Sequence, residues 1–257
     1  MPEAPQRIVS LVPSHTETLH ALGLGDRVVG RTRFCIHPEP WAETVPAVGG
    51  TKDASLDKIL ALRPDLVVAD KDENPKALVE ALQAAGVAVL WSDIATVEDA
   101  AGFVARLAAQ CGVADAGRAQ SDAILQALAE VRGAGRGVAV FCPIWHAPWM
   151  TFDATAYPSA VLDAVGLHNA FAGHAGTRYF EVTESDVAAS QASWALLPTE
   201  PFPFHKRRAA IDTAGLGRCG QTDRVRVIDG EALTWFGVRT APGLRELAKV
   251  ARELAQT

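Results

Sequence analysis

The stretch LDKILALRPDLVVADKDE, residues 56–73, predicts in order a short helix, a proline-containing linker, an apolar strand and an acidic loop. The helix is expected at residues 56–62 and the strand at residues 66–69. The stretch SDVAASQASWALLPTE, residues 185–200, repeats this order loosely. Strands that alternate with helices at this spacing are typical of parallel βαβ units. Two such stretches indicate two similar α/β lobes.

The same alternation extends outward from residues 56–73 in both directions. Ser14 is a predicted helix N-cap, with Glu17 at the third position after it. We expect further strands at residues 7–12, 27–30, 87–91, 138–142, 194–197 and 224–228. We expect further helices at residues 16–22, 75–85, 97–110, 158–165, 184–189 and 244–255.

A long helical pattern at residues 114–132 divides the chain. Its expected buried stripe contains Ala116, Ala119, Ala123, Leu125, Leu128 and Val131. The run GAGRG, residues 133–137, ends the pattern. We therefore predict an N-terminal α/β lobe at residues 1–112, a connecting helix at residues 113–133 and a C-terminal α/β lobe at residues 134–257.

Composition excludes several classes of function. The chain has 257 residues, of which 49% are hydrophobic, so it is long and apolar enough to bury a large core. The net charge of −6 argues against nucleic acid as a partner, because a phosphate backbone calls for a basic stripe. The one dense basic run, residues 205–208, is read as a solvated helix face.

Cysteine usage and the first residues bear on the compartment. The four cysteines are scattered without a CxxC pair, which favours free thiols over a disulfide framework or a zinc knuckle. The start, MPEAPQRIVSLVPS, has no basic region followed by an apolar run. We expect a cytoplasmic protein as written, or a periplasmic one if a signal was removed. No run is apolar for long enough to span a bilayer.

Loops that follow parallel strands are the expected ligand-binding loops, because ligands of such sheets sit beyond the carboxyl ends of the strands. In the first lobe these are residues 13–15, 34–38, 49–53 and 70–74. In the second they are residues 143–152, 175–180, 200–204 and 233–238. Two of the loops, FCIHP (residues 34–38) and the one in FCPIWHAPW (residues 141–149), combine cysteine, histidine and aromatic residues.

Three interpretations of these loops stay open. Cys35, His37, His146 and His15 are candidate metal ligands, although C-x-H is not a recognised chelating pattern. Cys35 or Cys142 is a candidate nucleophile, although nothing in the sequence fixes a base beside it. Aromatic loop residues favour a pocket for a large, flat, partly apolar ligand. The residues of this third interpretation are Trp145, Trp149, Tyr179, Trp235 and Phe236.

Two segments carry a family resemblance: RIVSLVPSHTETLHALGLGDRVVG (residues 7–30) and VGGTKDASLDKILALRPDLVVAD (residues 48–70). Together they resemble the opening of the cobalamin- and iron-siderophore-type substrate-binding proteins of bacterial ABC importers. The likeness covers nearly the whole chain and is stronger in the first lobe. It implies two Rossmann-like α/β lobes joined by a single long helix, with the ligand held in a cleft between the lobes.

The resemblance also implies which residues bind. The cobalamin binders are the closest match, and there the loop matching FCIHP carries a pocket aromatic where this chain has His37. An expected pocket tryptophan near Thr51 and Lys52 is missing, and Thr234 stands where relatives have an acid. Family members pair an acid on each lobe with permease arginines, and Glu73 (or Asp72) and Glu200 occupy the matching places. The implied ligand contacts are His15, Cys35, His37, Thr51, Lys52, Trp145, His146, Trp149, Tyr179, Trp235 and Phe236.

Three hypotheses follow. The first is a non-enzymatic, monomeric receptor that captures cobalamin or a related corrinoid for ABC-type uptake or intracellular handling, without a catalytic cofactor. In it, His37 and His146 supply polar contacts or an axial ligand to the cobalt. The alternative ligand is a metal ion, haem or a ferric siderophore chelate, bound through Cys35, His37 and His146. The third hypothesis is an intracellular enzyme with a reactive Cys35 or Cys142.

Overall fold

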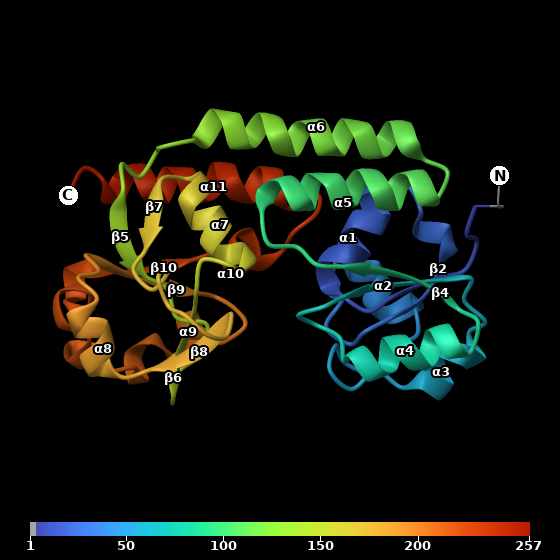
Figure 1. Ribbon diagram of the computed structural model, residues 1–257, viewed down its shortest axis with the longest axis horizontal. Helices are drawn as coiled ribbons and strands as arrows, with labels where there is room; N and C mark the ends of the chain where they lie inside the picture. Colours follow the sequence, from blue (N-terminus) through green and yellow to red (C-terminus); the bar gives the residue numbers. More distant parts are fainter. Residues whose placement is uncertain (1–3) are drawn as a thin grey trace. The chain divides into compact units, whose positions relative to one another are not determined.

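The structure is a computed structural model that describes residues 4–257. The chain forms two compact units, each with its own parallel sheet (Figure 1). Unit 1 is Met1–Ile94, Glu98–Ile124 and Phe236–Arg239, of which residues 1–3 lie outside the described part. Unit 2 is Ala95–Val97, Leu125–Trp235 and Thr240–Thr257. The α/β class with two lobes is confirmed, whereas the domain boundaries expected at residues 112 and 133 stay predictions.

The sheet of unit 1 is parallel throughout, in the order β2-β1-β3-β4. Its strands are β1 (Ile8–Ser10), β2 (Val28–Arg31), β3 (Leu66–Asp70) and β4 (Ala88–Ser92). All residues of β1 and β3 are buried, as expected for central strands covered on both faces. One core cluster joins Val9, Val67 and Ala69 of these strands to Leu11, Val48, Ile59, Val79 and Leu82.

The helices of unit 1 agree with the sequence pattern at most positions. They are α1 (Pro13–Ala21), α2 (Glu39–Thr44), α3 (Leu56–Ala61), α4 (Lys76–Ala84) and α5 (Val97–Gln110), whose first residue belongs to unit 2. The N-cap prediction was wrong: α1 begins at Pro13 with Val12 as its cap, and Ser14 is buried inside the helix. Proline fixes φ near the helical value, so it starts the helix before the serine.

Helix α6 (Ala114–Val131) is present where the long pattern predicts it, but its buried stripe differs. The buried residues are Gly117, Ile124, Ala127, Leu128 and Val131, whereas Leu125 is 42% exposed. Gly117 explains the shift, because a Cβ there would lie 2.2 Å from Cβ of Ala108 in α5. The close approach of α5 to α6 selects the face with glycine, which a hydrophobicity pattern does not register.

The sheet of unit 2 is also parallel, in the order β10-β9-β5-β7. Its strands are β5 (Val138–Phe141), β7 (Leu167–Asn169), β9 (Trp194–Pro198) and β10 (Val225–Ile228). An antiparallel pair, β6 (Trp149–Phe152) and β8 (Tyr179–Val182), stands apart from this sheet. The sequence predicts loops at residues 143–152 and 175–180, whereas in the structure Trp149 begins a strand and pairs with Val182.

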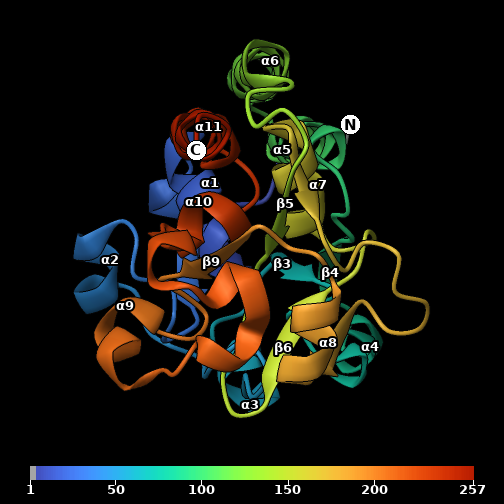
Figure 2. The ribbon, with the colours of Figure 1, turned by 90° about the vertical axis from the view of Figure 1, so that its left-hand side faces the viewer.

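The α-helices that lie wholly in unit 2 are α7 (Tyr157–Ala164), α8 (Glu184–Ala189), α9 (Phe204–Arg207), α10 (Gly230–Thr234) and α11 (Thr240–Leu254). Short 3-10 helices lie at Arg208–Ala210, Ala214–Gly220 and Thr222–Arg224. Helix α7 packs beside the β5–β7 side of the sheet, as Figures 1 and 2 show. Helix α11 starts four residues before the predicted start at residue 244. Across residues 4–257, no helix is both long enough and apolar enough to cross a bilayer.

Candidate functional site

A buried chain of hydrogen bonds lies at the carboxyl end of the unit 1 sheet. Asp70 ends β3, Ser92 ends β4, and His15 lies in the first turn of α1. The Ser92 hydroxyl donates to Asp70 Oδ2 at 2.5 Å, and His15 Nε2 lies 2.9 Å from the same hydroxyl. Because burial disfavours the carboxylate, the pKa of Asp70 is raised to about 6.

His15, a predicted ligand contact, is wholly enclosed within unit 1. Its ring stacks on Phe103 with 4.4 Å between centroids and lies 5.1 Å from the ring of Phe236. Burial lowers the pKa of His15 to about 3, so the ring is neutral at ordinary pH. Within residues 4–257, its Nδ1 atom has no hydrogen-bond partner. His15 therefore supports the interior of the unit and does not present a surface to a ligand.

In the loop FCIHP, neighbouring side chains differ sharply in exposure. Phe34 is 50% and Ile36 is 48% exposed, whereas Cys35 between them is fully buried. The Cys35 sulfur lies 3.0 Å from the hydroxyl of Thr16, and burial raises its pKa. The exposed apolar surface of the loop is therefore Phe34 and Ile36, which sequence reasoning missed. The signal that could have found them is the alternating direction of successive side chains in an extended segment.

The remaining predicted contacts of unit 1 lie in loops tied to one another. Asn74 donates through Nδ2 to the backbone carbonyl of Thr51 at 2.9 Å. The Lys52 ammonium donates to the carbonyl of Asp72, two residues after β3. Lys52 is exposed, while Thr51 and Glu73 are half-buried. The loop before α3 and the loop after β3 thus form one surface that carries Thr51, Lys52 and Glu73.

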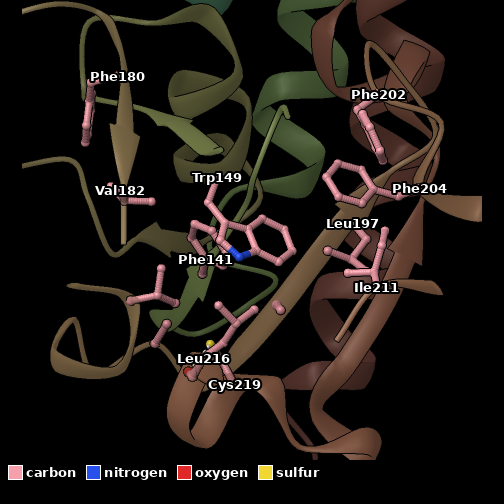
Figure 3. Close-up of a cluster of buried hydrophobic side chains, with 13 residues drawn as sticks. Phe141, Trp149, Phe180, Val182, Leu197, Phe202, Phe204, Ile211, Leu216 and Cys219 are labelled. Carbon is pink, nitrogen blue, oxygen red and sulfur yellow. Dashed lines mark hydrogen bonds between the residues drawn. The ribbon is translucent and has the colours of Figure 1, made fainter. Parts of the chain in front are cut away.

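Unit 2 carries an aromatic cluster made of Trp145, His146, Trp149 and Phe202. Trp145 is 44% exposed, and its ring lies 5.3 Å from that of Phe202 in an edge-to-face contact. His146 is half-buried, with its ring 4.6 Å from Trp149 and 5.9 Å from Phe202. Trp149 is buried and faces Phe204 with parallel rings, in the core that Figure 3 shows. The buried rings hold Trp145 and His146 at the surface of the unit.

Phe202 was not among the predicted contacts. It lies between two prolines in PFPF, residues 201–204, and therefore inside the ligand-binding loop predicted at residues 200–204. Its ring also receives the Arg207 guanidinium 5.5 Å from the ring centre, a cation–π contact. Tyr179, which was predicted, is half-buried at the start of β8, opposite Phe152.

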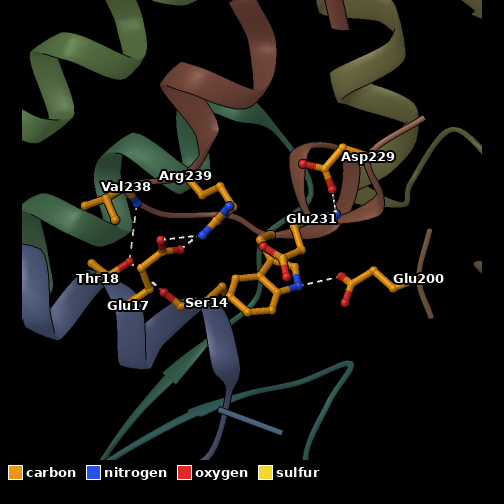
Figure 4. Close-up of polar contacts among 9 residues, drawn as sticks. Ser14, Glu17, Thr18, Glu200, Asp229, Glu231, Val238 and Arg239 are labelled. Atoms are coloured by element: carbon orange, nitrogen blue, oxygen red, sulfur yellow. Dashed lines mark hydrogen bonds and ion pairs between the residues drawn. The ribbon is translucent and has the colours of Figure 1, made fainter. Parts of the chain in front are cut away.

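The segment after α10 brings Trp235 and Phe236 into contacts with opposite units. Trp235 is 7% exposed and donates from its indole Nε1 to the Glu200 carboxylate within unit 2 (Figure 4). Phe236 is 8% exposed and contacts His15 within unit 1. Two residues further on, Val238 donates its amide to the Thr18 hydroxyl at 3.3 Å. The chain thus passes from unit 2 into unit 1 between adjacent aromatic residues.

The geometry gives little support to metal or thiol chemistry by the protein alone. Within residues 4–257, no three His, Cys, Asp or Glu side chains gather as a metal site would require. All four cysteines are free and buried. Burial raises the pKa of Cys111 and Cys219 to about 11 and also raises those of Cys35 and Cys142. What the exposed residues offer chemically is flat aromatic surface with an imidazole beside it.

Comparison with known proteins places these features in one context. The family described as periplasmic binding protein matches residues 8–197. A vitamin B12-binding protein of Vibrio campbellii is 31% identical over 169 residues, which are 65% of this chain and 61% of that protein. A vitamin B12-binding protein of Photorhabdus laumondii is 36% identical over 105 residues, 41% of this chain and 38% of that protein. The matched parts therefore span less than two thirds of these relatives.

Solved structures share the fold over essentially the full length. The periplasmic vitamin B12 binding protein BtuF of Vibrio cholerae has a TM-score of 0.83 at 23% identity, with all of both chains covered. The periplasmic heme-binding protein BhuT, in complex with two hemes, has a TM-score of 0.84 at 24% identity, covering 98% of this chain and all of that one. A periplasmic heme binding protein from Pseudomonas aeruginosa has a TM-score of 0.83 at 24% identity, covering 97% of this chain and 93% of that one. At these identities the likeness is one of fold.

Proposed function

We propose that this chain, which belongs to the periplasmic binding protein family, is a non-enzymatic receptor that captures vitamin B12 (cobalamin) or a related corrinoid. The observation that carries the proposal is the aromatic cluster of unit 2, where buried rings hold Trp145 with 44% of its surface exposed. An exposed aromatic ring held in place by buried rings is typical of sites for flat, partly apolar ligands. The vitamin B12-binding relatives support the choice of ligand.

We propose ligand contacts on loops of unit 2 and, separately, on loops of unit 1. In unit 2 they include Phe202, which joins the predicted residues Trp145, His146, Trp149, Tyr179 and Trp235. In unit 1 they include Phe34 and Ile36, which join His37, Thr51, Lys52 and Phe236. His15 and Cys35 support these contacts from beneath, because both are fully buried. Flat apolar faces of this kind match the ring system of a corrinoid.

The two histidines have a distinct proposed role. His37 is half-buried beside the exposed Ile36, and His146 is half-buried against Trp149. A single imidazole is enough for a polar contact or for an axial ligand to the metal of a bound chelate. This role does not need the three-ligand protein site that the described residues lack.

We also propose that the receptor delivers its ligand to an ABC permease through Glu73 in unit 1 and Glu200 in unit 2. Glu73 is half-buried in the loop after β3, next to Asp72. Carboxylates at such loops pair well with arginines of a partner, because the guanidinium offers two parallel donors. The proposal rests on the family resemblance, which implies an acid on each lobe that pairs with permease arginines.

The test is a fluorescence titration of the full chain with cobalamin, haem and a ferric siderophore. We expect cobalamin to quench tryptophan emission with one-to-one saturation. Trp145→Ala and Phe34→Ala should each weaken binding about tenfold, because each removes a large ring from the contact surface. Leu125→Ala and Val227→Ala are matched controls, since both side chains are exposed apolar groups outside the proposed contacts.

The outcomes separate the candidates. Binding of none of the three ligands would overturn the proposal. Saturation by haem or the siderophore but not by cobalamin would assign the alternative chelate, and His146→Ala should then alter the absorption spectrum of bound haem. An equal loss of affinity in Leu125→Ala and Trp145→Ala would show that the aromatic cluster is not the binding surface.

A further inference from the structure

We propose that Glu200 is a positioning residue for Trp235: its carboxylate fixes the orientation in which the indole meets the ligand. The inference rests on the proposed function, since it concerns a residue of the proposed contact surface. Glu200 Oε1 accepts a hydrogen bond from Trp235 Nε1 (Figure 4). The same oxygen accepts a second hydrogen bond from the Thr234 hydroxyl at 3.0 Å. One carboxylate oxygen thus accepts hydrogen bonds from Thr234, the last residue of α10, and from Trp235, the C-cap residue of that helix.

The backbone around Glu200 is built to hold that carboxylate against α10. A Cβ on Gly230, the first residue of α10, would lie 2.6 Å from Glu200 Cγ and 2.5 Å from Glu200 N. The Gly230 amide also donates to the hydroxyl of Thr199 at 2.8 Å. The glycine therefore lets the helix start lie directly on the Glu200 side chain, and the side chain has little freedom to leave Trp235.

The electrostatics of the contact also favour a fixed indole. Burial is the main cause that raises the pKa of Glu200, and the hydrogen bond from Thr234 opposes this rise most strongly. A half-buried carboxylate with neutral donors depends on those donors for its solvation. Loss of the carboxylate would leave the indole N–H, on a side chain only 7% exposed, without its acceptor. The pair is therefore expected to act as one unit.

This assignment differs from a role in docking alone. An acid that serves only to meet permease arginines should not affect ligand affinity when the permease is absent. A positioning residue should affect affinity in the isolated receptor, and its effect should vanish when Trp235 has lost its N–H donor. Glu200 can serve both roles, because a carboxylate has a second oxygen that can accept from a permease arginine while Oε1 accepts from Trp235.

The experiment uses the full chain with Glu200→Gln, Glu200→Ala, Trp235→Phe and the double variant Glu200→Ala/Trp235→Phe. The first readout is the indole N–H resonance of Trp235 in ligand-free protein, assigned by its loss in Trp235→Phe. We expect Glu200→Ala to shift this resonance and speed its exchange with water, and Glu200→Gln to retain a protected N–H. Glu181→Ala is the control, because Glu181 is an exposed acid of the same unit.

The second readout is cobalamin affinity. Glu200→Ala should weaken binding about tenfold, the scale of one lost charge-assisted hydrogen bond, and Glu200→Gln should restore most of it. The double variant should bind as Trp235→Phe does, because the two changes remove one interaction. Additive losses, or an unchanged indole resonance in Glu200→Ala, would overturn the inference. Failure of the wild-type protein to bind any of the three chelates would overturn only the proposed function, since the resonance reports on ligand-free protein.

Discussion

At the scale of single residues, the chain from Asp70 through Ser92 to His15 combines two groups whose pKa values are displaced in opposite directions. Burial lowers the pKa of His15 from 6.5 to about 3, so the folded state resists protonation of the ring. The unfolded chain therefore binds this proton first, and the free energy of unfolding decreases as the pH falls from about 6.5 towards 3. Burial raises the pKa of Asp70 from 3.8 to about 6, so the folded state binds this proton earlier than the unfolded state. The Asp70 contribution to the free energy of unfolding therefore increases as the pH falls from about 6 to 3.8.

We therefore expect the two contributions to offset each other in wild-type protein between about pH 4 and pH 6. In Asp70→Asn only the histidine contribution is left, and the free energy of unfolding should fall by about 1.4 kcal/mol for each unit of acidification. In His15→Gln only the Asp70 contribution is left. The free energy of unfolding should then rise as the pH falls through the same range, so its slope has the opposite sign to that of Asp70→Asn. Urea unfolding at a series of pH values measures both slopes. Parallel slopes in the two variants would contradict the assignment.

The thiols give a second prediction at this scale. Burial raises the pKa of all four cysteines, so little thiolate is present at neutral pH. We expect iodoacetamide to modify native protein at pH 8 far more slowly than a free peptide cysteine, and to modify all four cysteines in denaturing urea. Mass spectrometry of the labelled peptides reads the sites. Rapid native labelling of Cys35 or Cys142 would revive the enzyme hypothesis.

The residue scale also shows what sequence reasoning can reach. The aromatic residues of the loops were identified because these loops follow the carboxyl ends of the predicted strands, where ligands of parallel sheets bind. The sequence did not predict which side chains of the loops are exposed. Phe34 and Cys35 are adjacent and both apolar, and only the direction of the backbone exposes one and buries the other. Phe202 was missed because its contact with Trp145 joins loops more than fifty residues apart.

At the scale of elements, the long helices and the strands of the two parallel sheets were predictable, whereas the antiparallel pair was not. Helix α5 has the predicted bounds, and α6 ends one residue early. The four-residue strands β6 and β8 are too short for a period to be recognised. Each of them forms only by pairing with the other, about thirty residues away in the sequence. Local signals therefore predicted the parallel framework, whereas the pair that carries Trp149 and Tyr179 needed tertiary contacts.

The segment Phe236–Arg239 offers a test at this scale. Gly237 has a φ of +91°, and a Cβ there would lie 2.2 Å from the Thr18 hydroxyl oxygen. Gly133 has a φ of +76°, and a Cβ there would meet nothing within 4 Å. We expect Gly133→Ala to lower the free energy of unfolding by about 1–2 kcal/mol through backbone strain alone. Gly237→Ala should cost clearly more, because the clash with Thr18 is added.

Urea unfolding of the two glycine variants gives the comparison directly. Equal losses would mean that Phe236–Arg239 does not hold its position on α1 in solution. The prediction draws support from the contact that follows, where Arg239 donates to both carboxylate oxygens of Glu17 at 2.6 and 2.8 Å (Figure 4). A bidentate pair of this geometry is among the stronger charged contacts, and both side chains are about three quarters buried.

At the scale of the whole molecule, the chain crosses between units more often than its sequence suggests. Ala95–Val97 and Phe236–Arg239 each belong by contacts to the unit other than that of the residues around them. No periodicity marks such crossings, because contacts such as that of Arg239 with Glu17 join residues far apart in the sequence. The two-lobe class was nevertheless predictable, since each parallel sheet arises from local strand–helix alternation.

The ligand proposal makes its last prediction at this scale. A ligand that contacts loops of both units should stabilise both, whereas one that contacts a single unit should stabilise that unit alone. At a concentration 100-fold above its Kd, a ligand adds about 2.7 kcal/mol to the stability of the state that binds it.

Amide hydrogen exchange of the full chain, measured with and without cobalamin, reports on each unit separately through its peptides. We expect slower exchange at residues 31–38 in unit 1 and at residues 143–150 in unit 2, with α8 as an unaffected internal control because it carries none of the proposed contacts. Protection confined to the unit 2 loops would remove Phe34, Ile36 and His37 from the binding surface and leave the aromatic cluster of Trp145 as the whole site.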